Sequence, residues 1–272
     1  MPEGHVIHRL ADGLTDWFGG RTVDVTSPQG RFADEAALLN GTVLSGAEAY
    51  GKHLFVDFGP DRVVHIHLGL IGKLWLIDGV PTSPAGPETL RLRIARDDFS
   101  AELRGPQICR MITDTARADV VAASGDDPLR PEATGDKAWA KISRSGRSIA
   151  TLLMDQSVTA GVGNIYRAEV LFRHRIHPFK QGRTITRRTW NAVWADLVVL
   201  MRAGVTDGRV DTVRDAHLPE AMGRQPRVDR HGGEVYVYRR AGDPCLVCGM
   251  PVRTQVLEGR NLYWCNRCQR RR

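Results

Sequence analysis

Apolar residues near the start of the chain repeat with the period of a helix. They lie three or four positions apart and share one helical face: Val6, Leu10, Leu14 and Trp17. Pro2 suits the first turn of a helix, and two consecutive glycines at positions 19 and 20 end the pattern. We therefore expect an amphipathic helix that starts near Pro2 and stops before Gly19.

The pattern then changes to short segments rich in β-branched and aromatic residues, separated by Gly, Pro and Asp. These segments extend to about Asp114 and cover residues 22–25, 53–58, 63–67, 73–77, 90–95 and 100–103. Many short strands with turn residues between them are typical of an antiparallel sandwich or barrel.

Helical periodicity returns in the second half of the chain. Residues 126–131, Asp-Asp-Pro-Leu-Arg-Pro, interrupt the pattern and predict a linker. Beyond them, residues 149–155, 164–174 and 186–202 have helical spacing, whereas residues 204–240 are polar and part of them is expected to be loop. We expect three domains, at residues 1–124, 125–240 and 241–272.

The charge of the chain favours a polyanionic partner. It carries 38 Lys and Arg against 31 Asp and Glu, a formal net charge of +7. Its 272 residues, 42% of them hydrophobic, can bury one large core or two smaller ones. No apolar run reaches the length of a membrane span, so we expect no membrane partner.

The strongest chemical signal is a C-x2-C…C-x2-C array near the end of the chain, with sixteen residues between the pairs: Cys245, Cys248, Cys265 and Cys268. This spacing matches a tetrahedral zinc site. The alternative is two disulfides. No apolar signal segment precedes the chain, so we expect the reducing cytoplasm, where such thiols bind metal. We therefore predict one structural Zn²⁺ ion.

Arginines surround this array. Arg260 falls at the expected tip of the hairpin between the cysteine pairs, and further arginines follow at positions 267, 270 and 271. Guanidinium groups bind phosphate in a bidentate manner, so a zinc-stapled hairpin that carries arginine suggests contact with nucleic acid.

A glycine-rich stretch at residues 159–167 ends one predicted helix and starts the next. Gly161 and Gly163 permit a tight approach, and Asn164 can cap the new helix and present backbone N–H groups to an anion. A plain connection between helices would use the same residues, so both interpretations are open at this point.

Pro2 and Glu3 together suggest covalent chemistry. If Met1 is removed, Pro2 presents a secondary amine that titrates near pH 8, well below the value of about 10.4 for lysine. A neutral amine of this kind can attack a sugar C1′ and give an iminium ion, which favours elimination. The neighbouring carboxylate of Glu3 can move protons during base loss and ring opening.

Five motifs in the same order along nearly the whole chain resemble the formamidopyrimidine-DNA glycosylase/endonuclease VIII family. They are Pro2-Glu3-Gly4-His5, Tyr50-Gly51-Lys52-His53-Leu54-Phe55, His67-Leu68-Gly69-Leu70, Gly161-Val162-Gly163-Asn164-Ile165-Tyr166 and Gly259-Arg260. The resemblance implies an α+β multidomain fold: an N-terminal helix with an antiparallel β-sandwich, a helix-two-turn-helix domain and a zinc-finger β-hairpin. It also implies that a damaged base is flipped out of the DNA duplex into a pocket.

The resemblance assigns roles to individual residues. Pro2 would be the Schiff-base nucleophile, and Glu3 the proton donor that opens the sugar. Lys52, on a strand after Gly51, would contact the lesion phosphate and assist β-elimination. Asn164 would bind backbone phosphate, and Arg260 would bind phosphate and assist δ-elimination. The implied partner is double-stranded DNA with a damaged base or an abasic site, bound at the nucleoid by a monomer.

The substrate class depends on where the chain departs from part of the family. Oxidised-purine glycosylases typically begin Pro-Glu-Leu-Pro and carry an Arg and a Phe after an Asp-Pro, whereas Gly4 and His5 follow Glu3 and neither residue follows Pro106. The start resembles endonuclease VIII, which favours oxidised pyrimidines; oxidised purines are the alternative. Gly69 replaces a polar residue that often fills the void, so Leu70 and Ile71 are the expected apolar wedge.

A protein of another class fits several of these features. A zinc-hairpin DNA-binding protein or damage sensor without catalysis would share the charge, the cysteines and the glycine-rich turn. Pro2, Glu3 and Lys52 favour the enzyme. We expect packing or DNA-facing roles, rather than a second metal, for His5, His8, His65 and His67, and a core position for Cys109.

Overall fold

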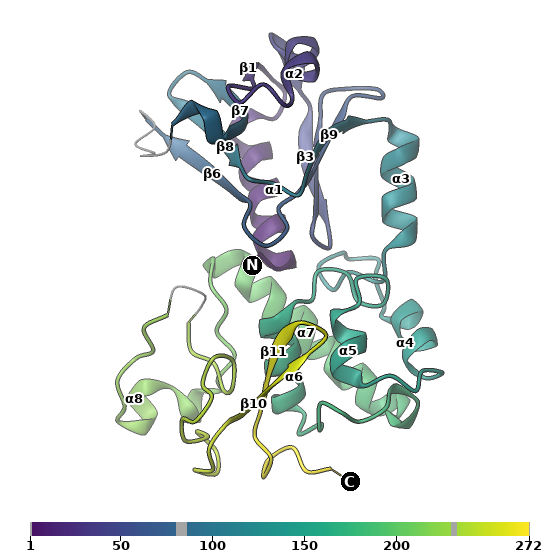
Figure 1. Ribbon diagram of the computed structural model, residues 1–272, viewed down its shortest axis with the longest axis vertical. Helices are drawn as coiled ribbons and strands as arrows, with labels where there is room; N and C mark the ends of the chain where they lie inside the picture. Colours follow the sequence, from purple (N-terminus) through teal and green to yellow (C-terminus); the bar gives the residue numbers. More distant parts are fainter. Residues whose placement is uncertain (1, 80–85, 230–232, 272) are drawn as a thin grey trace. The chain divides into compact units, whose positions relative to one another are not determined.

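The computed structural model describes residues 2–79, 86–229 and 233–271. The chain divides into two units, Met1–Ala123 and Ser124–Arg272, and each has its own hydrophobic core (Figure 1). The further division of the second unit at residue 240 stays a prediction.

The first unit contains three helices and nine strands among its described residues. The helices are α1 (Gly4–Phe18), α2 (Ala33–Leu39) and α3 (Asp114–Ala123), with a 3-10 turn at Pro87–Thr89. The strands are β1 (Arg21–Thr26), β2 (Thr42–Leu44), β3 (Gly46–Tyr50), β4 (His53–Asp57), β5 (Val63–His67), β6 (Lys73–Asp78), β7 (Leu90–Arg96), β8 (Phe99–Arg104) and β9 (Ile108–Ile112).

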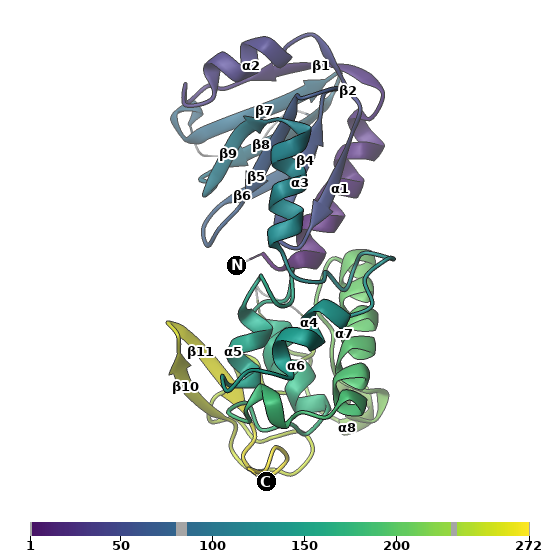
Figure 2. The same cartoon turned by 90° about the vertical axis from the view of Figure 1, so that its right-hand side faces the viewer.

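The strands of this unit form two antiparallel sheets. One sheet has the order β2-β1-β7-β8-β6 and the other the order β3-β4-β5-β9. Inward-facing residues of both sheets and one face of α1 form a single core, and α3 lies against the second sheet (Figure 2). The predicted antiparallel sandwich is therefore confirmed.

Helix α1 buries a wider face than the predicted one: Leu14 belongs to both, and Leu10 and Trp17 also pack against the core. Its fully buried side chains include Ile7, Ala11, Leu14 and Phe18, whereas Val6, Leu10 and Trp17 are only half-buried. Both sets of residues are apolar, so the periodicity of the sequence alone does not decide which set packs most deeply against the sheets. The Thr15 hydroxyl donates to the backbone oxygen of Ala47 at 3.1 Å, which attaches the C-terminal half of the helix to β3.

The start of α1 also differs from the prediction. The helix begins at Gly4, and Glu3 is its N-cap with an extended backbone (φ −109°, ψ 173°). Pro2 therefore precedes the helix rather than forming its first turn, and Met1 lies outside the described residues. The nitrogen of Pro2 is consequently not part of the helical backbone.

The second unit contains helices and one β-hairpin. The helices are α4 (Asp136–Ile142), α5 (Ile149–Met154), α6 (Asn164–Arg173), α7 (Arg187–Asp207) and α8 (Pro219–Met222), with 3-10 turns at Gly182–Thr184 and Asp215–His217. Strands β10 (Arg253–Leu257) and β11 (Arg260–Trp264) form the hairpin. Residues from β11, including Leu262 and Trp264, share the core of the helices, so the hairpin is packed against them.

The predicted linker at residues 126–131 is wrong. Asp126 and Asp127 are buried, and Oδ2 of Asp126 accepts hydrogen bonds from the backbone N–H groups of Lys137 and Ala138 at 3.0 and 3.3 Å. The polar sequence thus anchors the start of α4. The boundary between the units lies earlier, where α3 ends at Ala123.

A buried carboxylate holds the core of the second unit together. Glu169 of α6 is fully buried and accepts hydrogen bonds from the backbone N–H groups of Tyr236, Val237 and Tyr238 at 2.7 to 2.9 Å. The Thr212 hydroxyl donates to the same carboxylate at 2.5 Å. Glu169 thereby ties the segment before the zinc hairpin to α6.

We expect Glu169→Ala to lower the free energy of unfolding of the second unit by about 3–5 kcal/mol, because it leaves several buried donors unsatisfied. Urea unfolding followed by tryptophan fluorescence measures this, since Trp139, Trp190, Trp194 and Trp264 lie in this unit. The exposed Glu132→Ala is the control and should change stability by less than about 0.5 kcal/mol. A loss no larger than that of the control would show that the Glu169 network is dispensable.

No helix in the part of the chain that the structure describes combines the length and apolar character needed to cross a membrane.

Candidate active site and metal centre

The strand register gathers most of the predicted catalytic residues at one end of the first unit. His53, the first residue of β4, pairs with His67, the last residue of β5, and His67 pairs with Ile108 at the start of β9. The turn before β4 and the turn after β5 therefore lie side by side. The same end of the sandwich holds the start of α1, and so Pro2 and Glu3 (Figures 1 and 2).

Glu3 is the buried member of the N-terminal pair. Its exposed fraction is 1%, whereas Pro2 is only half-buried. His5, two positions further on, is also buried, and burial together with the neighbouring His8 lowers the pKa of His5 to about 4. The start of α1 therefore carries a buried carboxyl group and a buried imidazole that is neutral at pH 7.

Lys52 lies in a turn and not on a strand as predicted. Gly51 and Lys52 form the two-residue connection between β3 and β4, in which Tyr50 pairs with His53. Lys52 therefore lies outside the Tyr50–His53 pair, the last residue pair that joins the two strands. Its half-buried position lets the ammonium group act on the histidines beside it.

A row of three histidines crosses the sheet next to Lys52. Nδ1 of His53 lies 2.9 Å from Nε2 of His65, and the rings of His53 and His67 are 5.0 Å apart. Burial lowers the pKa of His53 to about 4, with added effects from the charges of His67 and Lys52. Burial also lowers the pKa of His65 to about 4 and, together with Lys52, lowers that of His67. All three rings are neutral at pH 7, and positive charge next to them comes from Lys52, beside His53 and His67, and from Arg110, beside His65.

The turn after β5 exposes the predicted wedge residues. Leu70 and Ile71 are 56% and 80% exposed, which is unusual for two adjacent aliphatic side chains. Gly69 has a φ of +67°, and a Cβ at this position would lie 2.9 Å from Cβ of Gln107. A larger residue would therefore be strained by this φ and would require Gln107 to shift.

In the second unit, Asn164 joins helix α6 to the hairpin. Its Nδ2 donates to the backbone oxygen of Asn261 at 2.9 Å, and its Oδ1 accepts from the guanidinium of the buried Arg167. The N-cap of α6 is Gly163, so the predicted capping role of Asn164 is wrong: Asn164 is the first residue of the helix. Its side chain reaches toward the hairpin instead.

Arg260 is the first residue of β11 and lies directly after the tip. Glu258 and Gly259 form the two-residue turn, both with positive φ (48° and 73°), as a tight hairpin of this type requires. Because Asn164 contacts Asn261, the residue after Arg260, the structure brings these two predicted phosphate ligands to the same end of the hairpin.

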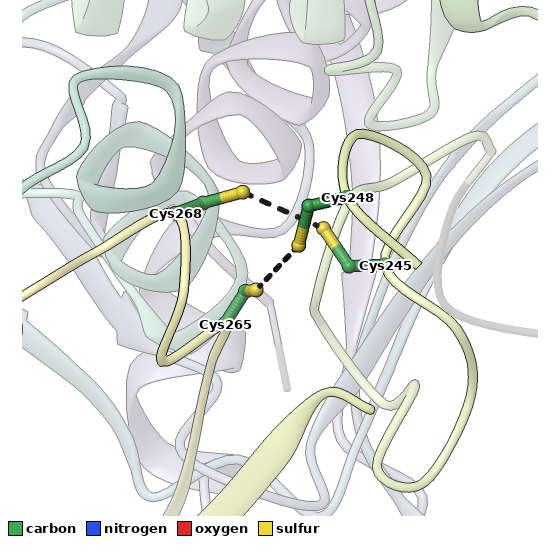
Figure 3. Close-up of side chains that lie close together, drawn as sticks. All are labelled: Cys245, Cys248, Cys265 and Cys268. Carbon is green, nitrogen blue, oxygen red and sulfur yellow. Dashed lines mark hydrogen bonds between the residues drawn. The ribbon is translucent and has the colours of Figure 1, made fainter. Parts of the chain in front are cut away.

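The four cysteines converge as predicted (Figure 3). Their sulfur atoms all lie within 4.8 Å of one another, with 3.9 Å between Cys245 and Cys268 and 3.4 Å between Cys248 and Cys265. Sulfurs around one zinc ion at about 2.3 Å should be roughly 3.8 Å apart, whereas a disulfide needs about 2.05 Å. The distances fit a metal and exclude the two-disulfide alternative.

The pKa values of two of these thiols shift in opposite directions. Burial, with the neighbouring Cys265 thiol, raises the pKa of Cys245 to about 11. Burial acts to raise the pKa of Cys248 as well, but hydrogen bonds from Met250 and the neighbouring cysteines outweigh it and lower this pKa. Cys109 is different: it packs against the core of the first unit, and burial raises its pKa to about 12.

Three supporting residues were not predicted. The Gln156 side chain donates to the backbone oxygen of Val162 at 2.9 Å and accepts from the N–H of Gly161 at 3.1 Å, which shapes the glycine-rich turn. Arg167 orients Asn164, and His53 lies between Lys52 and the other histidines. Only Arg167 had a sequence signal, because it lies three positions after Asn164 on a helix.

The sandwich, the helical unit and the four-cysteine hairpin together define a class of DNA-processing enzyme, and family comparisons agree. The formamidopyrimidine-DNA glycosylase N-terminal domain matches residues 1–108, and the H2TH domain of the same glycosylase matches residues 124–215. The zinc finger found in FPG and IleRS matches residues 242–271.

Relatives cover the chain along its whole length. Endonuclease 8 1 of Mycobacterium tuberculosis is 50% identical over 276 residues, 99% of this chain and 100% of that protein. The formamidopyrimidine-DNA glycosylase of Aromatoleum aromaticum is 33% identical over 283 residues, all of both chains. A mutant of Lactococcus lactis FPG in complex with a Fapy-dG containing DNA has the same fold, with a TM-score of 0.78, 20% identity and coverage of 99% and 100%.

The chain therefore belongs to the formamidopyrimidine-DNA glycosylase/endonuclease VIII family. Members of this family are DNA glycosylases with AP lyase activity, and the chain is an enzyme of this kind in base excision repair. The four cysteines and the zinc-finger match together indicate zinc at this four-cysteine site.

Proposed function

We propose that the protein removes oxidised pyrimidines from double-stranded DNA and then cleaves the strand by β,δ-elimination through a Schiff base on Pro2. The observation that carries this proposal is the convergence of Pro2, Glu3, Lys52 and the exposed Leu70-Ile71 turn at one end of the sandwich. A nucleophile, an acid, a cation and an apolar wedge are the groups that this reaction needs.

The reaction starts at the amine of Pro2 after removal of Met1. The lone pair of the nitrogen attacks C1′ of the flipped nucleotide, the bond from C1′ to the base breaks, and its electrons leave with the base, which takes up a proton. Glu3, buried at the start of α1, protonates O4′ as the sugar ring opens and the iminium ion forms.

Strand cleavage follows from the iminium ion. Loss of a proton from C2′ expels the 3′ phosphate, and a second elimination expels the 5′ phosphate; water then releases the sugar fragment from Pro2. We assign the contact with the lesion phosphate to Lys52, which lies in the turn between β3 and β4 beside the row of histidines. We assign phosphate binding to Asn164 and Arg260, with Arg260 assisting the second elimination.

We also propose the metal content, the oligomeric state and the location of the protein. One Zn²⁺ ion, bound by all four cysteines, would fix the base of the hairpin and thereby the position of Arg260. Four reduced thiols suit the cytoplasm, where the protein would act on the nucleoid as a monomer.

The substrate class rests on two features of the first unit. Purine-type Arg and Phe residues are absent after Pro106, where Gln107 instead packs against Gly69. The exposed Leu70 and Ile71 form a simple apolar wedge. Saturated pyrimidines such as thymine glycol have lost planarity and stack poorly, so extrusion costs less and such a wedge suffices. 8-Oxoguanine still stacks and pairs well.

We expect single-turnover excision of thymine glycol opposite adenine to be at least about tenfold faster than that of 8-oxoguanine opposite cytosine, a difference of about 1.4 kcal/mol in activation free energy. The measurement uses matched duplexes that differ only in the lesion pair, with dihydrouracil and 5-hydroxycytosine as further pyrimidine substrates.

An abasic-site duplex serves as the control, because it needs no base removal and reports the lyase steps alone. Faster removal of 8-oxoguanine than of thymine glycol, with equal cleavage of the abasic site, would assign the protein to oxidised purines while leaving the Pro2 chemistry intact.

A further inference from the structure

The second unit contains a cavity at the base of the zinc hairpin that none of the roles above uses. Its volume is about 680 Å³, and it lies between the α6–α7 connection and the cysteine loops. Its walls include Arg175, Lys180, Arg267 and Arg270, together with the zinc-site residues Cys248 and Cys268.

The cavity combines basic side chains in its wall with two cysteine sulfurs of the zinc site, Cys248 and Cys268. Its lining contains four Lys or Arg side chains and no Asp or Glu. Among the ion pairs formed within the described residues, none involves Arg175, Lys180, Arg267 or Arg270. The four basic groups outnumber the two thiolates of Cys248 and Cys268 in the wall, although solvent screens the exposed Arg175, Arg267 and Arg270. An anion in the cavity would therefore lower the electrostatic energy, most of all beside the half-buried Lys180.

The walls are fixed by buried contacts. Gln269 is fully buried; its Nε2 donates to the backbone oxygen of Ile176 at 2.8 Å, and its Oε1 accepts from the N–H of Cys265 at 2.9 Å. The rings of His177 and Trp264 also meet edge to face at 6.4 Å. These contacts join the two walls, so the cavity exists before any ligand binds.

The cavity is remote from the proposed phosphate contacts of the hairpin tip. Asn164 begins α6, whereas His174, in the cavity wall, follows its last residue, about 15 Å away along a ten-residue helix. Arg260 begins β11, whereas Cys265 follows that strand, about 17 Å away along five residues. The two regions lie at opposite ends of the same elements.

We propose that this cavity is a second anion site, which binds the phosphate groups of a nucleotide or of a DNA strand outside the lesion. Arginine and lysine side chains are the usual phosphate ligands in proteins, and a volume in this range holds a ligand of nucleotide size. Because Cys248 and Cys268 belong to the wall, a bound phosphate would also stabilise the loops of the zinc site.

The test uses the full-length, zinc-loaded protein and isothermal titration calorimetry with inorganic pyrophosphate and with thymidine monophosphate. We expect Lys180→Glu to weaken binding at least about tenfold. The matched control is Arg202→Glu, which changes the net charge equally but lies exposed on α7, about 24 Å along the helix from Thr186 in the cavity wall. Arg202→Glu should bind like the wild type.

A second experiment distinguishes between the two possible ligands of the cavity, a free nucleotide and a DNA strand. Fluorescence anisotropy with an undamaged duplex compares the same two variants at low salt, where phosphate contacts are strongest. Weaker binding of small phosphates by Lys180→Glu identifies a free nucleotide, whereas weaker binding of the duplex alone identifies a DNA strand. Pro2 takes no part in either arm, so a failure of the lyase chemistry would not alter the result.

Zinc content is measured for every variant. A variant that keeps its zinc but binds phosphate more weakly has lost the anion site, whereas a variant that loses its zinc has lost the local fold. Arg175→Asn is a second test variant, because Arg175 has a φ of 54° and asparagine tolerates this conformation well. If Lys180→Glu and Arg175→Asn, with zinc retained, bind pyrophosphate, the nucleotide and the duplex as tightly as Arg202→Glu, the second anion site does not exist.

Discussion

One residue added before Pro2 should abolish the covalent protein–DNA adduct that borohydride traps with abasic DNA. In the proposed mechanism, removal of Met1 leaves the Pro2 nitrogen as a secondary amine, and reduction of its iminium with C1′ makes the link permanent. An added residue converts the nitrogen to an amide, whose lone pair is delocalised and cannot attack. We expect adduct formation to fall by more than about a hundredfold.

The same extension placed after Arg272 is the matched control, and it should leave the adduct yield unchanged. The intact mass of the untagged protein must first show that Met1 has been removed. Pro2 precedes α1 and is not part of its helical ladder, so the extension should not unfold the sandwich. An undiminished adduct in the extended protein would show that another amine, with Lys52 the first candidate, is the nucleophile.

The sequence predicted six of the nine strands that the structure describes in the first unit. The segment at residues 63–67 coincides with β5, and five other segments match their strands to within one or two residues. The short β2, β3 and β9 were missed; β3, Gly46–Tyr50, begins with Gly-Ala-Glu-Ala, residues that are small or have low strand preference. It becomes a strand through pairing with β4 and packing against α1.

The parts of the candidate site whose residues lie close together in the sequence could be predicted. The spacing of the four cysteines and the pair Pro2-Glu3 can be read from neighbouring residues. The row of His53, His65 and His67 needs the register of β4 against β5, which no single segment contains. The contact of Asn164 with Asn261 joins residues 97 positions apart and depends on how the hairpin packs on α6.

Cys265→Ser should release zinc and weaken DNA binding at least about tenfold, or about 1.4 kcal/mol. Zinc binding contributes about 10–16 kcal/mol to the folding of small zinc domains, so a lost thiolate should free the cysteine loops. Cys265 is fully buried and its N–H is bonded to Gln269, so the change also loosens the attachment of the hairpin to the helices. Arg260, at the other end of β11, would then lose its fixed position.

The first unit should survive this change, because its core shares no residue with that of the second unit. Zinc content by atomic absorption, DNA affinity by anisotropy and the melting of each unit are the measurements. Cys109→Ser is the matched control, since Cys109 belongs to the first unit and lies outside the cluster of four cysteines. It should keep both its zinc and its affinity for DNA.

Arg260→Ala should keep its zinc but bind DNA more weakly and slow the second elimination. Full zinc content and unchanged affinity in Cys265→Ser would remove this residue from the ligand set and separate the hairpin from DNA binding.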